Sequence, residues 1–108
     1  MRRRVRGGGV IVNIRGRVTA AEHVYAHDRI ERLRRLARGE DFRGTVSIVA
    51  EGTPGAVVSA SGEVHLDGHV ARAEADGATI RNAIDLLDER LRDSIERLGI
   101  RAQKEKKR

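Results

Sequence analysis

The sequence predicts an α+β domain in the order β-α-β-β-β-α, with a four-stranded sheet and two helices packed on one face of it. An Asp67-Gly68 pair between two alternating segments predicts a tight hairpin, because these residues tolerate the positive φ angles of a type I′ turn. Thr19 followed by Glu22 is a capping-box pattern that predicts the start of a helix. After Gly77, apolar residues recur at steps of three and four, which predicts a second helix.

The first third of the chain is typical of a strand followed by a helix. Residues 10–14 are rich in β-branched side chains, and Gly16 ends the expected strand. The helix is expected from Thr19 to a closing glycine at Gly39. Its apolar face consists of Tyr25, Ala26, Ile30, Leu33, Leu36 and Ala37.

Three further strands are expected in the middle of the chain. They run from Thr45 to Glu51, from Ala56 to Leu66 with a bulge at Gly62, and from Val70 to Ala75. The economical architecture for these elements is an antiparallel meander with both helices packed on one face.

The last element is expected to be an amphipathic helix of about five turns, long enough to cover a small sheet. Its residues mix both signs of charge and sum to −1 between residues 81 and 97. One side carries the apolar residues Ile80, Ala83, Ile84, Leu87, Leu91, Ile95 and Leu98.

The net charge of +6 over the 108 residues is concentrated at the two ends. Residues 1–9 and residues 101–108 carry +4 each, which leaves −2 for residues 10–100. We therefore expect a basic N-terminal arm (1–9), a single folded domain (10–100) and a basic C-terminal tail (101–108). Basic tails bind polyanions with little specificity, so the domain needs separate evidence for RNA binding.

Several classes of function lack support in the sequence. No apolar run reaches the roughly 20 residues of a membrane helix, and the chain has no cysteine, which favours a cytoplasmic protein. His23 and His27 have the spacing of two metal ligands, but no third ligand is evident, so no metal site is expected. No nucleophile has a base nearby, so the prediction is a protein without catalytic activity, cofactor or small-molecule substrate.

The first helix is rich in arginine, and its side chains allow two interpretations. Arg29, Arg32, Arg34, Arg35 and Arg38 provide guanidinium groups that can bind phosphate in a bidentate manner. The alternative is an ordinary solvated helix face with pairs such as Asp28 to Arg32 and Glu31 to Arg35. The residues alone favour the second interpretation.

Two helix patterns together resemble the ribosome hibernation-promoting factor family, also called the ribosome-associated inhibitor (sigma-54 modulation) family. The segment 25–33 is similar to the family's aromatic residue followed by two basic-apolar pairs, with Arg29 and Arg32 where its lysines usually stand. Residues 73–77, at the end of a strand, precede a helix whose Ala83-Ile84-Asp85 and Arg90-Leu91 also resemble the family pattern. The resemblance extends over residues 10–104, as a short form or as one domain of a long form.

This resemblance implies a fold like that of double-stranded-RNA-binding domains. It implies binding to the small ribosomal subunit and its ribosomal RNA near the decoding channel, with translation blocked by occupancy. Asp93 and Glu96 depart from the family pattern. Carried over by position, the implied RNA-binding residues are Arg29, Arg32, Arg81, Arg90, Arg97, Arg101 and Lys104.

Two other functions remain open. One is a general RNA-binding module that recognises the shape of a duplex. The other is a protein-interaction module, because residues 39–78 sum to −5 and could engage a partner or a second copy in a homodimer.

Overall fold

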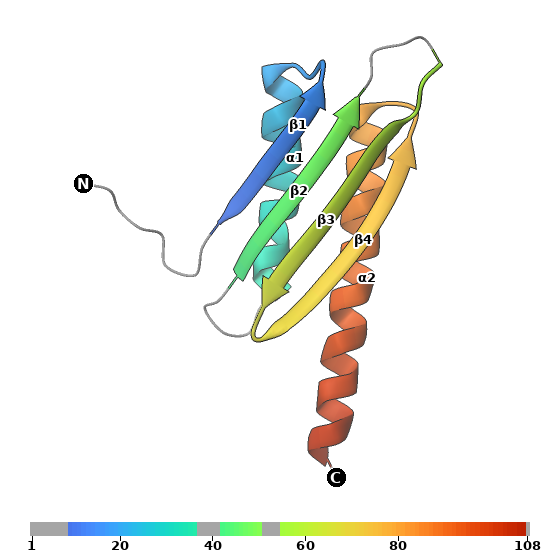
Figure 1. Cartoon of the computed structure of the whole chain (residues 1–108). Helices are drawn as coiled ribbons and strands as arrows, with labels where there is room; N and C mark the ends of the chain where they lie inside the picture. Colours follow the sequence, from blue (N-terminus) through green and yellow to red (C-terminus); the bar gives the residue numbers. More distant parts are fainter. Residues whose placement is uncertain (1–8, 37–41, 51–54, 108) are drawn as a thin grey trace, which may run out of the picture.

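The computed structural model describes residues 9–36, 42–50 and 55–107, and the side chains among them up to residue 98. Four strands and two α-helices follow in the predicted order (Figure 1). They are β1 (Val10–Gly16), α1 (Ala20–Glu31) with a 3₁₀ turn η1 (Arg32–Leu36), β2 (Phe42–Ala50), β3 (Val58–Leu66), β4 (His69–Gly77) and α2 (Ile80–Lys107).

The strands form one sheet in the order β1-β2-β3-β4. β2 pairs with β3 and β3 pairs with β4, both in the antiparallel direction, as expected. The expectation for β1 was wrong, because β1 runs parallel to β2, with Val10 opposite Gly44 and Gly16 opposite Ala50. The reason is α1, which carries the chain back along the sheet and so lets β2 start at the same end as β1.

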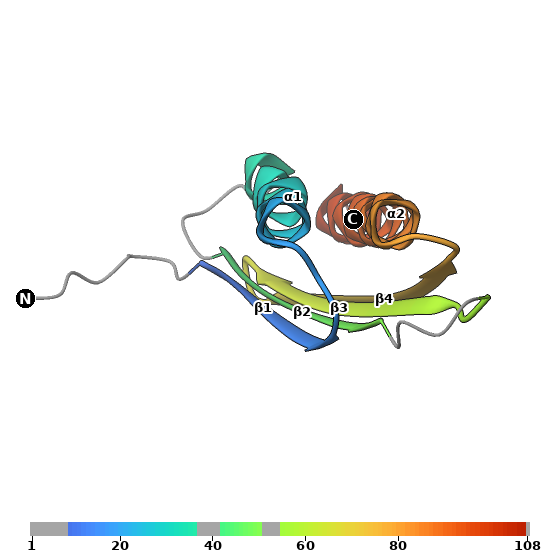
Figure 2. The ribbon, with the colours of Figure 1, turned by 90° about the horizontal axis from the view of Figure 1, so that it is seen from above.

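Both helices pack side by side on one face of the sheet and leave the other face uncovered (Figure 2). The core between these layers is aliphatic and is centred on Val46, Ile48 and Val64 of the sheet. Ile30 and Leu33 reach it from α1 and η1, and α2 contributes Ile84, Leu87 and Leu91, all of them fully buried. The two predicted apolar faces are therefore confirmed as the core-facing sides of the helices, except at Ala37, which lies outside the described residues.

The predicted start of α1 is confirmed. Thr19 is its N-cap, and its hydroxyl accepts a hydrogen bond from the Glu22 backbone N–H at 3.1 Å while the Glu22 carboxylate accepts one from the Thr19 N–H at 3.0 Å. The end differs, because the α-helix stops at Glu31 and tightens into η1. Such 3₁₀ turns are common at helix ends. Gly39, the expected closing residue, lies outside the described residues.

The hairpin between β3 and β4 is also confirmed. Asp67 and Gly68 have φ angles of 49° and 81°, and Leu66 pairs with His69 on either side of them. The bulge expected at Gly62 is wrong, because Gly62 pairs regularly with Val46 and with Ala73. A Cβ at Gly62 would lie 3.1 Å from Leu91 Cδ1, so the glycine is there to let α2 approach the sheet closely.

α2 is longer than the sequence pattern predicts. Its helical backbone continues through residues 101–107, the segment expected as a basic tail, and extends beyond the end of the sheet (Figure 1). Among the described residues, neither helix combines the length and the hydropathy that a membrane crossing requires.

Candidate nucleic-acid interface

The predicted RNA-binding residues lie in the helix layer, where the structure divides them into separate groups. Arg29 and Arg81 lie between the two helices, and Arg32 lies at the end of α1. Arg90 and Arg97 lie on the opposite flank of α2, beside β4. The side chains of Arg101 and Lys104 lie outside the described residues, although the α2 backbone includes both positions.

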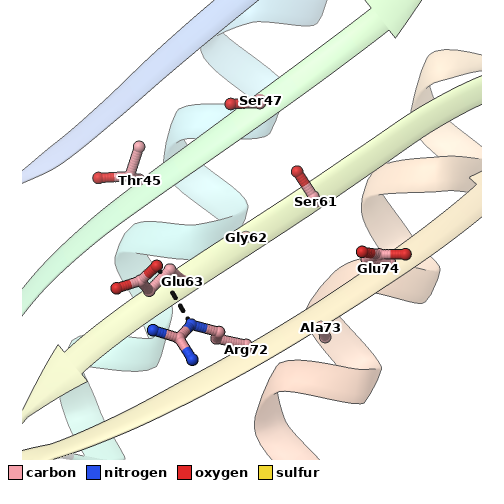
Figure 3. Close-up of a pocket in the computed structure, with 8 residues that line it drawn as sticks. All are labelled: Thr45, Ser47, Ser61, Gly62, Glu63, Arg72, Ala73 and Glu74. Atoms are coloured by element: carbon pink, nitrogen blue, oxygen red, sulfur yellow. Dashed lines mark hydrogen bonds and ion pairs between the residues drawn. The ribbon is translucent and has the colours of Figure 1, made fainter.

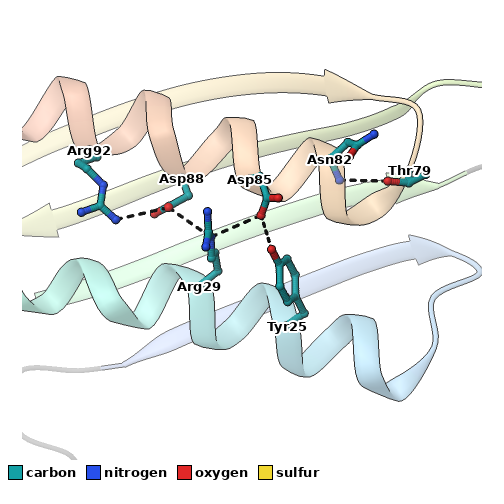
Figure 4. Close-up of polar contacts among 7 residues, drawn as sticks. All are labelled: Tyr25, Arg29, Thr79, Asn82, Asp85, Asp88 and Arg92. Atoms are coloured by element: carbon teal, nitrogen blue, oxygen red, sulfur yellow. Dashed lines mark hydrogen bonds and ion pairs between the residues drawn. The ribbon is translucent and has the colours of Figure 1, made fainter.

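Arg29 is held between two carboxylates of α2 (Figure 4). Its Nε lies 3.5 Å from Asp85 Oδ1 and 3.3 Å from Asp88 Oδ2. Nε is within ion-pair distance of both oxygens but is aligned for a hydrogen bond with neither. These contacts neutralise Arg29 inside the protein, so its position favours a role in joining the helices.

Asp88 is the buried polar residue of this arrangement, with only 3% of its surface exposed. Its Oδ2 also lies 3.4 Å from Arg92 Nη2 on the next turn of α2. A carboxylate this buried is stable only when cations compensate for its lost hydration. Arg29 and Arg92 supply that compensation from both sides, and together with Asp85 they form what we call the interhelical ion cluster.

Tyr25 completes the contact between the helices. Its hydroxyl donates a hydrogen bond to Asp85 Oδ1, and this bond, followed by desolvation, raises the pKa of the phenol above its ordinary value. The Arg81 guanidinium lies 4.5 Å from the ring centroid, within the range of a cation–π contact. Arg81 therefore packs against the Tyr25 ring and is still exposed to solvent.

The flank of α2 beside β4 carries a second group. Arg90 Nη1 donates a hydrogen bond of 2.6 Å to the backbone carbonyl of Glu74, and Arg97 is seven residues further along. Seven residues are about two turns, so both lie on one side of the helix. The helical period puts positions 101 and 104 on that side as well, so we call Arg90, Arg97, Arg101 and Lys104 the α2 stripe.

An acidic strip separates the two groups. Glu89 and Glu96, also seven residues apart, lie on the outer side of α2 and are exposed, as is Asp93. The helix layer therefore presents no continuous basic track from α1 to the stripe among the described side chains. Asp93 and Glu96, which depart from the family pattern, therefore change the surface of α2 and not its core-facing side.

Arg32 and its neighbours form a small basic end to α1. Arg32 is exposed and is the C-cap of the helix. Arg34 pairs with Glu31 at 2.6 Å and lies over the buried ring of Phe42, with 5.0 Å to the centroid. The sequence predicted a pair between Glu31 and Arg35, but Glu31 pairs with Arg34, three residues along the chain. Arg34 at the same time lies over the core residue Phe42.

Sequence reasoning missed the interhelical ion cluster, although a signal was present. Asp85, Asp88 and Arg92 are spaced by three and four residues, so they share one side of α2. That side is adjacent to the apolar stripe, where a charged residue is partly buried and needs a partner. Within the described residues no group of histidine and acidic side chains could hold a metal ion.

Comparisons with known proteins give a consistent fold. No family model and no curated protein matches the chain. The structure is similar to the crystal structure of the Thermus thermophilus Protein Y N-terminal domain, with a TM-score of 0.68 and 27% identity over 83% of this chain and 98% of that one. It is similar in fold to a ribosomal subunit interface protein from Coxiella burnetii, with a TM-score of 0.68 and 11% identity over 85% of this chain and 98% of that one.

The two helix motifs and the order of the strands along the chain point to the same family as these structural similarities. The chain has the fold of these two proteins, and its resemblance to the ribosome hibernation-promoting factor family is confirmed.

Proposed function

We propose that this chain is a ribosome-associated factor that binds RNA of the small subunit near the decoding channel and blocks translation by occupying it. The observation that carries the proposal is the fold shared with the Thermus thermophilus Protein Y N-terminal domain at 27% identity. The Coxiella burnetii protein of the same fold is itself described as a ribosomal subunit interface protein. A ribosomal partner implies a cytoplasmic location.

The α2 stripe, together with Arg32 and Arg81, is the proposed RNA contact. Arg81 and Arg97 are exposed, and Arg90 is ordered by its bond to the β4 backbone. Ordered guanidinium groups lose little entropy when they bind phosphate. Arg29 belongs to this proposal only indirectly, because its charge is neutralised by Asp85 and Asp88 and its role is to hold α1 against α2.

Occupancy needs no chemistry from the protein. The proposal therefore involves no catalytic residue, cofactor or metal, and the chain acts by excluding other ligands from the RNA surface that it covers. It predicts competition with whatever else binds in that channel. The acidic strip at Glu89 and Glu96 restricts the contact to two separate groups of phosphates.

Competition on isolated small subunits tests the occupancy mechanism. We expect the purified chain to bind them, and we expect binding to weaken at least tenfold when messenger RNA and transfer RNA are already in place. Equal binding to empty and filled subunits would contradict occupancy of the channel. Failure to bind either form would contradict ribosome association altogether.

A general RNA-binding module of the same fold is the second candidate, and the length of α2 favours it. The helix extends past the sheet, and residues 101–108 carry +4. Duplex RNA of unrelated sequence separates the two functions, since a general binder would be displaced from ribosomes by a modest excess of it. A ribosome-specific factor would stay bound.

A further inference from the structure

The face of the sheet that the helices leave uncovered has features that the proposed function does not use. We call it the open sheet face, and it consists of the odd-numbered residues of β1, β2 and β3 and the even-numbered residues of β4. These positions are exposed or half-buried, while the alternate positions of each strand face the helices. A four-stranded sheet with one bare face is a candidate interaction surface.

The centre of the open sheet face is shallow and lined by small hydroxyl side chains (Figure 3). Thr45, Ser47 and Ser61 line a hollow of about 470 Å³ together with Glu63, Arg72 and Glu74. The three hydroxyl side chains are short, so the middle of the sheet is lower than the charged side chains on its β4 side. The nearby Glu63 carboxylate is already satisfied within the chain, 2.7 Å from His65 Nε2 and 3.3 Å from Arg72 Nε. Those contacts hold the pKa of Glu63 below its ordinary value.

Charge is distributed unevenly across the open sheet face. The β1 and β2 side carries Arg15 and Arg43 and no acidic residue. The β4 edge carries Glu74 and Asp76, and its one arginine, Arg72, is paired with Glu63 of β3. Neither Arg15 nor Asp76 has an ion-pair partner among the residues that the structure describes. The face therefore has a basic side and an acidic side, each with charge left to satisfy.

The strand register places these two unpaired charges at opposite ends of one row. Arg15 is opposite Val49, Val49 is opposite Ser59, and Ser59 is opposite Asp76. In the next row, Ser47 is opposite Ser61 across the middle of the sheet. A two-fold axis parallel to the strands, between β2 and β3, exchanges β1 with β4 and β2 with β3. It therefore brings Arg15 of one copy over Asp76 of the other, twice, and Ser47 over Ser61.

We propose that the open sheet face is the interface of a homodimer, in which two copies stack sheet on sheet about this axis. Such an interface uses the same patch on both subunits, so the patch must be complementary to itself, as Arg15 and Asp76 at the two ends of their row are. Two stacked sheets also favour strand directions within about 30° of each other, which keeps each row over its partner. The helix layers stay on the outside, available for RNA.

The dimer is expected to be weak. Strands of up to nine residues at ~3.3 Å per residue, in a sheet of four strands ~4.8 Å apart, cover roughly 550 Å². Standard interfaces bury about 800 Å² per partner, so this one belongs to the small and transient class. Two ion pairs at its rim then decide specificity more than affinity.

RNA is a poor occupant for the open sheet face. Single-stranded RNA is recognised on sheets by aromatic stacking, but the chain has one tyrosine, one phenylalanine and no tryptophan. Tyr25 belongs to α1 and Phe42 is buried in the core, so neither lies on the open sheet face. Glu74 and Asp76 would also repel phosphate.

Charge reversal with complementation tests the homodimer. Sedimentation equilibrium of the full chain from roughly 10 µM to 1 mM covers the range in which an interface of this size should associate. The variants R15D and D76R should each weaken self-association by about tenfold, because each places two like-charged pairs in the interface. An equimolar mixture of the two should recover wild-type association, since every contact in the mixed dimer joins opposite charges. The double variant R15D/D76R should recover it as well.

The matched control is R97D on the α2 stripe, which makes the same charge change on the other side of the molecule and should leave self-association unchanged. Circular dichroism checks the fold of each variant. If R15D or D76R does not fold, the neutral variant R15Q or D76N takes its place. A wild-type chain that stays monomeric throughout the range would overturn the proposal. So would a dimer that the mixture fails to restore, or one that R97D weakens as much as R15D does. Loss of RNA binding in R15D with intact self-association would assign the face to RNA instead.

Discussion

At the scale of single residues, the chain depends on a few side chains with unusual surroundings. Tyr25 is the single tyrosine of the chain and connects α1 to Asp85 of α2. Gly62 is a position where α2 packs closely on the sheet, with two leucine side chains of the helix above it. Tyr25 and Gly62 each give a prediction that can be tested independently of the other.

Titration of Tyr25 by its phenolate absorbance should give a pKa above the ordinary value of about 10. The hydrogen bond to Asp85 stabilises the protonated phenol, and burial adds to it. Because the folded-state pKa is raised, the stabilisation is fully present below pH ~10 and is lost as the pH rises through the folded-state value. The variant D85N should lower the pKa of Tyr25. It removes the carboxylate charge that raises this pKa and leaves the positive charges of Arg29 and Arg81, which lower it. An unchanged pKa in D85N would contradict this contact.

Replacing Gly62 with valine should lower the free energy of unfolding by about 1–3 kcal/mol, as overpacked core sites do. The added Cβ would lie 3.1 Å from Leu91 Cδ1 and 3.3 Å from Leu87 Cδ2, and the methyl groups closer still. The control is valine at Ser61, the neighbouring residue on the open sheet face, where it should be neutral or slightly stabilising. Urea denaturation measures both. Equal stabilities of the two variants would show that α2 does not pack closely at Gly62.

At the scale of elements, the interhelical ion cluster fixes α1 against α2. Asp88 receives Arg29 from the other helix at 3.3 Å and Arg92 from its own at 3.4 Å. Removing one member of a buried ion group leaves uncompensated charge, which costs more than the group itself contributes. Because α1 and α2 carry the proposed RNA contacts, their relative position matters for binding as well as for stability.

The variant D88A should therefore destabilise the domain by about 1–3 kcal/mol, less than a fully buried pair would because Arg29 and Arg92 are partly exposed. D93A makes the same change at an exposed position of the same helix and should stay within ~0.5 kcal/mol of wild type. Thermal or urea unfolding of D88A and D93A measures the two free energies of unfolding. Comparable stabilities would mean that the cluster does not hold the helices together.

The elements also show what the sequence could predict. Local signals were sufficient for the Thr19 cap, the Asp67-Gly68 turn and the apolar face of α2, because each depends on neighbours in sequence. The parallel pairing of β1 with β2 and the role of Gly62 depend on contacts across the sheet, which spacing does not encode. The ion cluster depends on the relative position of two helices, so the sequence did not show that Arg29 lies between Asp85 and Asp88.

At the scale of the whole molecule, two surfaces have different chemistry. The helix layer carries the α2 stripe and Arg81, while the open sheet face is nearly neutral, with Arg15 and Asp76 at opposite ends of one row. RNA binding through the stripe should weaken steeply with salt, with a log–log slope of about −0.7 to −0.9 for each phosphate contact. The variant R97E should reduce that slope by about one contact. A slope that stays unchanged in R97E would place the RNA contact elsewhere.

The central claim is that the helix layer binds the small ribosomal subunit, and sedimentation with purified subunits tests it most directly. At low salt the wild-type chain should sediment with small subunits and remain unbound with large ones. R97E on the α2 stripe should weaken binding by roughly tenfold, which is about 1.4 kcal/mol, while R43E, the same charge change on the open sheet face, should leave it intact. A wild-type chain that stays at the top of the gradient, or an R43E variant as impaired as R97E, would contradict the account.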